Sequence, residues 1–167
     1  MQRWQQAQKM KLKYTSKFDL TKILEIERNF ENTEFISPYN EERHLKVIQD
    51  KDEEHLSVFN ENSELIGFVI LAGLNNESKS IEFKRIIIAE KNKGYGIQTI
   101  NLIKKKCFQE YNCNRLWLDV FDFNQKAIYI YEKLGFIKEG ILRECIKTDK
   151  GYKNLIIMSI LRSEYRI

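Results

Sequence analysis

The stretch IIIAEKNKGYGI, residues 86–97, decides the fold of this 167-residue chain. Its three isoleucines leave no polar position, which predicts a strand covered on both faces. A short polar loop follows, and Gly94 and Gly96 then predict a helix that begins at Gly94. The start of a helix carries unpaired backbone N–H groups and a dipole that favours an anion. Because Lys91 and Lys93 add positive charge here, we expect a phosphate-binding loop.

The spacing of the two glycines does not name the anion, because glycines at a strand-to-helix junction are also typical of a simple tight turn. The loop lacks the Gly-Lys-Ser/Thr ending of a nucleotide-binding P-loop. It also lacks the third glycine of a dinucleotide-binding fingerprint. The identity of the bound anion must therefore be inferred from other parts of the sequence.

The remainder of the chain predicts one α+β domain over residues 11–167, preceded by a flexible extension of residues 1–10. Before the loop we expect a first strand, a helix capped by Asp19, and a second helix after Pro38. After it, strands and helices alternate. Residues 55–59 and 65–74 are expected to form an antiparallel hairpin. A further strand ends at residue 88, and the remaining expected strands are 115–120, 136–146 and 155–161. The later helices begin at residues 94 and 124.

Composition and charge narrow the function. A content of 43% hydrophobic and 31% charged residues is typical of a globular protein, and no apolar run is long enough to cross a membrane. Three cysteines without CxxC spacing predict buried, reduced thiols, and with no export signal they favour the cytoplasm. Two histidines and no cysteine cluster predict no metal site. Basic residues that do not alternate with aromatic ones argue against nucleic-acid binding.

The charges are unevenly distributed. The segment from Glu25 to Glu54 has a net charge of −6, so the rest of the chain, with a total of +4, carries +10. This asymmetry predicts one anionic and one cationic ligand. The alternative is that each charged run is a solvated helix face, which we prefer for residues 104–106.

Two segments together resemble the GNAT superfamily of N-acetyltransferases. Residues 91–96, KNKGYG, resemble its acyl-CoA loop, Arg/Gln-x-x-Gly-x-Gly/Ala, although Lys91 keeps the charge without the guanidinium fork. Residues 124–136, NQKAIYIYEKLGF, resemble the family's Asn-x-x-Ala-x-x-x-Tyr-x-Lys-x-Gly-Phe segment. Residues 139–144 and 151–152 are similar to the polyamine and ribosomal-protein N-terminal acetyltransferase branches. The resemblance extends from about Leu12 to Leu161.

The resemblance implies a mixed, mostly antiparallel sheet of about seven strands, with helices on both faces and a splay between two central strands. It implies acetyl-CoA as co-substrate, with its pantetheine arm in the splay. The residues implied in cofactor binding are Ile86, Ile87, Ile88, Lys91, Lys93, Gly94, Tyr95, Gly96, Ile97, Asn124, Ala127 and Lys133. For Asn124 helix capping is an additional role, and for Lys133 an exposed lysine without a ligand is the alternative.

The implied reaction is aminolysis of a thioester, which needs a neutral amine and a proton for the departing thiolate. The resemblance makes Tyr131 the general acid; a packing role is the alternative. Glu82 is the candidate general base, because a half-buried carboxylate with a raised pKa accepts a proton through water. A surface ion pair between Glu82 and Lys84 is the competing interpretation.

Acidic residues near the only proline suggest where the acceptor binds. Glu31, Glu34 and Tyr39 lie in or near this loop, where family members build the acceptor pocket, and carboxylates attract a cationic amine. We expect a polyamine or a similar small amine. The alternatives are the amino terminus of a protein, such as a ribosomal protein, and a CoA-binding sensor without catalysis. The apolar strand at 155–160 either pairs across a homodimer axis or completes the sheet.

Overall fold

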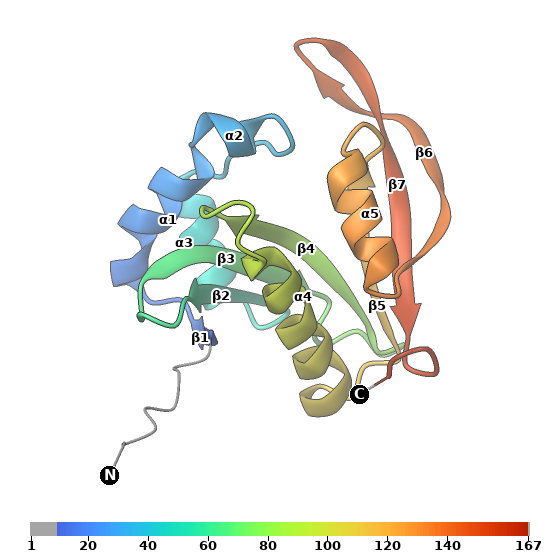
Figure 1. Ribbon diagram of the computed structural model, residues 1–167, viewed down its shortest axis with the longest axis horizontal. Coiled ribbons are helices and arrows are strands. Elements are labelled where there is room, and N and C mark those ends of the chain that lie inside the picture. The colour runs from blue at the N-terminus through green and yellow to red at the C-terminus, as the bar shows by residue number, and fades with distance from the viewer. Residues whose placement is uncertain (1–9, 167) are drawn as a thin grey trace.

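A computed structural model describes residues 10–166, except the side chain of Phe30, and forms one seven-stranded sheet (Figure 1). The strand order is β1-β2-β3-β4-β5-β7-β6, and every neighbouring pair is antiparallel except β4 and β5. The predicted mixed sheet is therefore confirmed. The strands are β1 Lys11–Tyr14, β2 Glu53–Phe59, β3 Leu65–Ala72, β4 Ser80–Ile88, β5 Arg115–Phe121, β6 Ile137–Thr148 and β7 Gly151–Leu161.

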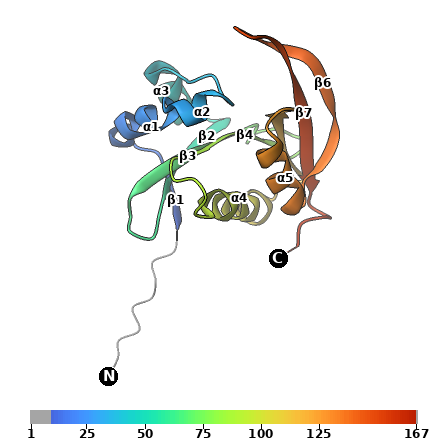
Figure 2. The same cartoon turned by 45° about the horizontal axis from the view of Figure 1, so that its top comes forward.

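Helices cover both faces of the sheet, as predicted (Figure 2). Helices α1 and α3 pack on one face and bury Ile23, Ile26 and Val47 against β3 and β4. Helices α4 and α5 pack on the other face over a larger apolar core. The helices are α1 Leu20–Glu27, α2 Phe30–Thr33, α3 Glu41–Gln49, α4 Tyr95–Lys105 and α5 Gln125–Lys133, with a π-helix at Lys106–Glu110.

The start of α1 differs from the prediction. Asp19 is the last residue of a 3₁₀ turn, Lys17–Asp19, that precedes α1, and it makes no capping bond to α1. Its carboxylate instead accepts from the backbone N–H of Ser16 at 2.9 Å. The carboxylate stabilises the turn one step earlier in the chain because Ser and Asp three residues apart favour reciprocal capping.

Strands β4 and β5 separate after only three paired positions. The parallel ladder joins Ser80–Glu82 to Arg115–Trp117 and then ends, although both strands continue. The expected splay is therefore present. In β4, Lys84 is an extra residue at a bulge, because Phe83 and Arg85 pair with consecutive residues of β3.

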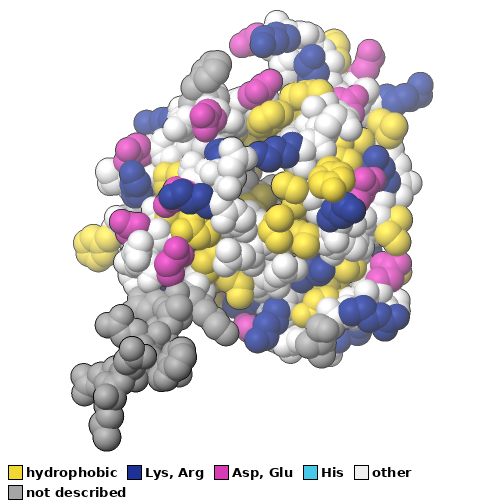
Figure 3. Space-filling view, in the orientation of Figure 1, with side chains coloured by type: hydrophobic (Ala, Val, Ile, Leu, Met, Phe, Trp, Pro, Cys, Tyr) yellow, Lys and Arg dark blue, Asp and Glu magenta, His cyan; other side chains and the backbone are white. Residues whose placement is uncertain are grey.

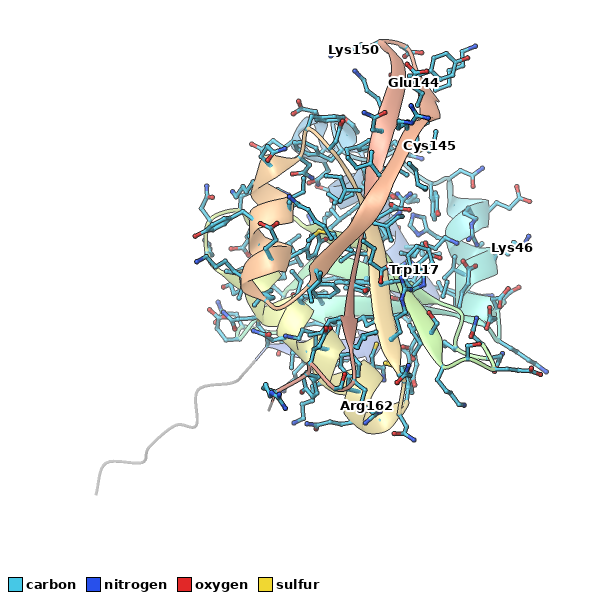
Figure 4. The ribbon with its side chains drawn as sticks, turned by 90° about the vertical axis from the view of Figure 1, so that its right-hand side faces the viewer. Lys46, Trp117, Glu144, Cys145, Lys150 and Arg162 are labelled. Atoms are coloured by element: carbon cyan, nitrogen blue, oxygen red, sulfur yellow. The ribbon has the colours of Figure 1, made fainter. Side chains whose placement is uncertain are left out.

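The chain ends bear on three of the sequence predictions. Residues 1–9 of the expected extension lie outside the described residues, whereas Met10 is buried in the core. Strand β7 lies between β5 and β6, so 155–160 completes the sheet. The expected burial of all three cysteines is wrong for Cys145, which is exposed on the edge strand β6. Figure 4 shows Cys145 and Glu144 toward the projecting end of the β6–β7 hairpin, with Lys150 at its tip.

Within residues 10–166, no helix is long and apolar enough to span a membrane. Over the same residues, His, Cys, Asp and Glu side chains form no group of three or more that is suited to a metal ion.

Candidate active site

A cavity of about 770 Å³ lies where β4 and β5 separate, between the α2–α3 segment and α5. In the space-filling view the surface is hollowed near its centre, and basic side chains lie beside the hollow (Figure 3). Nine of the residues predicted from the sequence line this cavity: Glu31, Tyr39, Glu82, Ile86, Ile87, Lys91, Asn124, Ala127 and Tyr131. Residues from four separate segments thus converge on one site.

The other predicted residues do not line it: Glu34, Ile88, Lys93, Gly94, Tyr95, Gly96, Ile97 and Lys133. Lys93 forms an ion pair with Glu90, and the Lys133 ammonium lies over the Tyr129 ring, 5.4 Å from its centroid. The glycine loop can contribute its backbone without lining the cavity with side chains. Lys133 faces a neighbour on its own helix, so the alternative of a lysine without a ligand fits it.

The glycine loop has the backbone geometry of an anion site. Gly94 has a φ of +77°, a left-handed conformation that side chains disfavour, and its carbonyl accepts the first bond of α4, from Gln98 N–H at 3.1 Å. The N–H groups of residues 95–97 precede that bond and have no partner inside the helix. They form a concentration of donors at the positive end of the α4 dipole.

Close packing of β3 on β4 positions the strand before this loop. A Cβ atom added at Gly67 would lie 2.2 Å from the Ile87 carbonyl oxygen, so glycine is required there. The N–H of Ala89 donates to the Ile66 carbonyl at 2.7 Å and holds the end of β4.

Two lysines face the cavity close to the loop. Lys91 donates to the Asn32 side chain at 2.7 Å, and desolvation by the surrounding protein lowers its pKa. Lys126, which the sequence analysis did not select, also lines the cavity and donates to Asn92 at 2.9 Å. Its only signal in the sequence is its place in the first turn of α5. Together they give this end of the cavity the charge that a diphosphate requires.

Helix α5 supplies Asn124 and Tyr131. The Asn124 side chain caps the helix by accepting from Ala127 N–H at 3.2 Å. Tyr131 is 8% exposed, packs edge-on against Phe136 and borders the cavity. Burial, assisted by the Asp119 carboxylate, raises the pKa of the Tyr131 hydroxyl far above neutrality, so this hydroxyl keeps its proton.

Two carboxylates lie on the strands that separate. Desolvation raises the pKa of Glu82 on β4, and Asp119 on β5 adds to this shift. Lys84 forms an ion pair with Glu53, and its positive charge opposes the rise in the pKa of Glu82. The pKa of Asp119 is also raised by desolvation. Asp119 was not predicted from the sequence. It stands two residues after Trp117, which pairs with Glu82, so the side chains of Asp119 and Glu82 lie on the same face of the sheet.

The acceptor side of the cavity is built from the α2–α3 segment. Tyr39 lies between two arginines, with the guanidinium of Arg85 at 3.7 Å and that of Arg43 at 5.2 Å from its ring centroid. Glu31 lines the cavity, whereas Glu34 is exposed outside the lining. Arg85, which like Lys126 and Asp119 was not predicted from the sequence, also lines this wall.

A smaller cavity of about 440 Å³ adjoins the first, since Glu82 and Lys84 line both. Its other charged residues are all acidic: Asp50, Asp52 and Glu53. Trp117 of β5, labelled in Figure 4, forms one wall.

The combination of splayed strands, a glycine loop before α4 and a buried tyrosine defines an acyl-CoA-dependent acetyltransferase site. The pattern of the acetyltransferase (GNAT) family matches residues 21–136. The chain belongs to this family and is an N-acetyltransferase.

Its relatives include two bacterial enzymes. The spermidine N(1)-acetyltransferase of Vibrio cholerae is 34% identical over 144 residues, which is 83% of each chain. That of Escherichia coli is 31% identical over 166 residues, covering 95% of this chain and 89% of the relative. The crystal structure of the V. cholerae spermidine N-acetyltransferase with CoA and spermine superposes with a TM-score of 0.85 at 31% identity, over 94% of this chain and 98% of that one.

Proposed function

We propose that the chain transfers an acetyl group from acetyl-CoA to a primary amine of a polyamine or a similar small cation, by direct aminolysis of the thioester. The observation that carries this proposal is the placement of Glu82 and Tyr131 around one cavity at the end of the β4–β5 ladder. One carboxyl group has a raised pKa and one phenol stays protonated, which are the properties of a general base and a general acid.

The residues of the chain have separate tasks in this reaction. The N–H groups of residues 95–97, with Lys91 and Lys126, bind the diphosphate of the co-substrate. Beyond Glu82, the edge of β4 that no longer pairs with β5 binds the pantetheine arm and polarises the acetyl carbonyl. Glu82 accepts the proton that the ammonium must lose, directly or through water. Tyr131 donates its proton to the leaving sulfur, whose ordinary pKa is about 8.5.

The second cavity favours an extended cation as the acceptor. An amine that reacts beside Glu82 can place a distal ammonium beside Asp50 and Asp52, because Glu82 lines both cavities. The third carboxylate there, Glu53, is already paired with Arg43 and Lys84. Carboxylates offset the cost of desolvating such a charge. The names of the relatives, which specify spermidine, point to the same substrate class.

An acceptor screen tests this function, with release of the CoA thiol as the readout. Polyamines should give the highest kcat/KM, ahead of aminosugars, amino acids and short peptides. Preference for a peptide with a free amino terminus would favour the alternative, acetylation of a protein N-terminus. If acetyl-CoA binds but no amine supports thiol release, the chain is a CoA-binding sensor and the proposal is wrong.

We also propose that the chain forms a homodimer through the edge strand β6. This strand has one neighbour, β7, and exposes Ile137, Ile141 and Leu142. Sedimentation equilibrium of the wild type and an Ile141→Lys variant tests this. A wild type that remains a monomer at micromolar concentration contradicts it.

A further inference from the structure

Arg85 joins three parts of the acceptor wall. Its guanidinium forms an ion pair with Glu27 of α1 and donates to the Ser37 carbonyl at 3.1 Å. Its guanidinium carbon also lies over the Tyr39 ring, 3.7 Å from the ring centroid. The Glu27 side chain is completely buried, so this ion pair is shielded from water and from salt.

Glu27 is held on its other side by a chain of buried hydrogen bonds. His44 Nε2 lies 2.7 Å from the Glu27 carboxylate, and His44 Nδ1 lies 2.9 Å from His55 Nε2. His55 Nδ1 lies 2.8 Å from the Thr15 hydroxyl. Burial lowers the pKa of His55 to about 3, so this ring is neutral near neutral pH.

The direction of the bond between His44 and Glu27 follows from the chemistry of the carboxylate. A carboxylate paired with an arginine only accepts, so His44 donates to Glu27 from Nε2. Glu27 is therefore held by His44 on one side and by Arg85 on the other.

The bulge at Lys84 is what directs Arg85 to this side of the sheet. Phe83 packs in the core beneath α4, and two residues farther along a regular strand Arg85 would point the same way. The extra residue reverses the alternation, so that Arg85 and Ile87 face α1 and α3 instead. The arginine reaches Glu27 and the acceptor loop for this reason.

Arg85 stands between the cavity and Glu27, and a guanidinium donates hydrogen bonds but accepts none, so the network offers no path for a proton into the cavity. What the contacts provide is a fixed geometry between α1, β4 and the segment 36–40. Planar, forked donors suit this task because one side chain can bind a carboxylate and a carbonyl together.

We propose that Arg85, supported by Glu27 and His44, is a positioning residue that fixes the loop 36–40 and thereby the acceptor beside Tyr39. This inference rests on the proposed function, in which the amine reacts in the cavity that Glu82, Tyr39 and Arg85 line together. Arg85 acts through the loop and does not touch the reacting atoms.

The first test is steady-state kinetics of Arg85→Lys, which keeps a counter-charge for Glu27 but removes the fork and the flat face. The KM for the acceptor should rise by about tenfold, while kcat and the KM for acetyl-CoA stay within about twofold, because only the acceptor is misplaced. Glu25→Gln is the matched control, since Glu25 lies on the same helix in an exposed pair with Lys22. An unchanged acceptor KM in Arg85→Lys overturns the proposal.

The second test does not depend on the acceptor, and its first measurement needs no variant. Backbone ¹⁵N relaxation of the wild type should give order parameters near 0.85 for Ser37 and Tyr39, and values below about 0.6 would contradict a fixed loop. In Arg85→Lys, or in the charge-neutral pair Glu27→Gln with Arg85→Gln, these values should fall. If the wild type acetylates no amine, the proposed function fails, and the relaxation data still decide whether the loop is clamped.

Discussion

Replacing Tyr131 with phenylalanine removes one hydroxyl group from the wall of the cavity. Within the described residues this hydroxyl has no hydrogen-bond partner, and the ring packs against Phe136. The substitution therefore breaks no bond within the protein and leaves the ring in place. We expect the free energy of unfolding to change by less than about 1 kcal/mol.

The effect on catalysis should be much larger. A positioned general acid contributes roughly 10²- to 10⁴-fold to a rate, or about 3 to 5 kcal/mol of activation free energy. The raised pKa of Tyr131 keeps the phenol protonated at every working pH, so the wild type uses the full contribution. We expect kcat of Tyr131→Phe to fall by that factor while the Kd for acetyl-CoA changes less than about twofold.

The assay is thiol release at saturating acetyl-CoA and acceptor, with calorimetric titration of acetyl-CoA and a thermal melt on the same preparation. A kcat within about threefold of wild type, in a folded variant that still binds acetyl-CoA, would refute the acid role. Tyr131 would then be a packing residue on the inner face of α5.

Three further outcomes are expected. In pH profiles, kcat/KM should fall as pH drops through the pKa of Glu82, which is raised above 4.5. Glu82→Gln should lose this acid limb of the profile and about 10²-fold in rate, and a variant that keeps the acid limb would show that another group is the general base. The pKa of His55 is about 3 in the folded protein and 6.5 in the unfolded chain, so the free energy of unfolding should fall by about 1.4 kcal/mol per pH unit as pH drops from 6.5 toward 3. Urea unfolding of His55→Gln at several pH values should lack this dependence. Lys126→Ala should weaken acetyl-CoA binding and reduce its salt dependence in calorimetric titrations, whereas the control variant Lys150→Ala, at the tip of the β6–β7 hairpin, should change neither. Equal effects of the two substitutions would contradict phosphate binding by Lys126.

The elements of the fold were predictable because each has a local cause. The hydrophobic pattern and the turns predicted the hairpin β2–β3, and Gly94 predicted the start of α4. Register was not predictable to the same degree. The bulge at Lys84 has no signature in the sequence, and without it Arg85 would be expected on the face of Phe83.

The site was predicted where motifs mark it and missed where tertiary contacts make it. Tyr131 and Asn124 were identified from one segment, and both line the cavity. Asp119 and Arg85 join the site only because β4 and β5 separate and β4 bulges, which are long-range events. Composition alone could not distinguish Glu31, which lines the cavity, from Glu34, which does not.

The proposed function requires a diphosphate bound where the chain turns from β4 into α4, and a crystal structure with coenzyme A tests this requirement most directly. We predict diphosphate oxygens within hydrogen-bonding distance of the N–H groups of residues 95–97, and the thiol beside the Tyr131 hydroxyl. Coenzyme A bound elsewhere, with the start of α4 free of phosphate, would contradict the central claim.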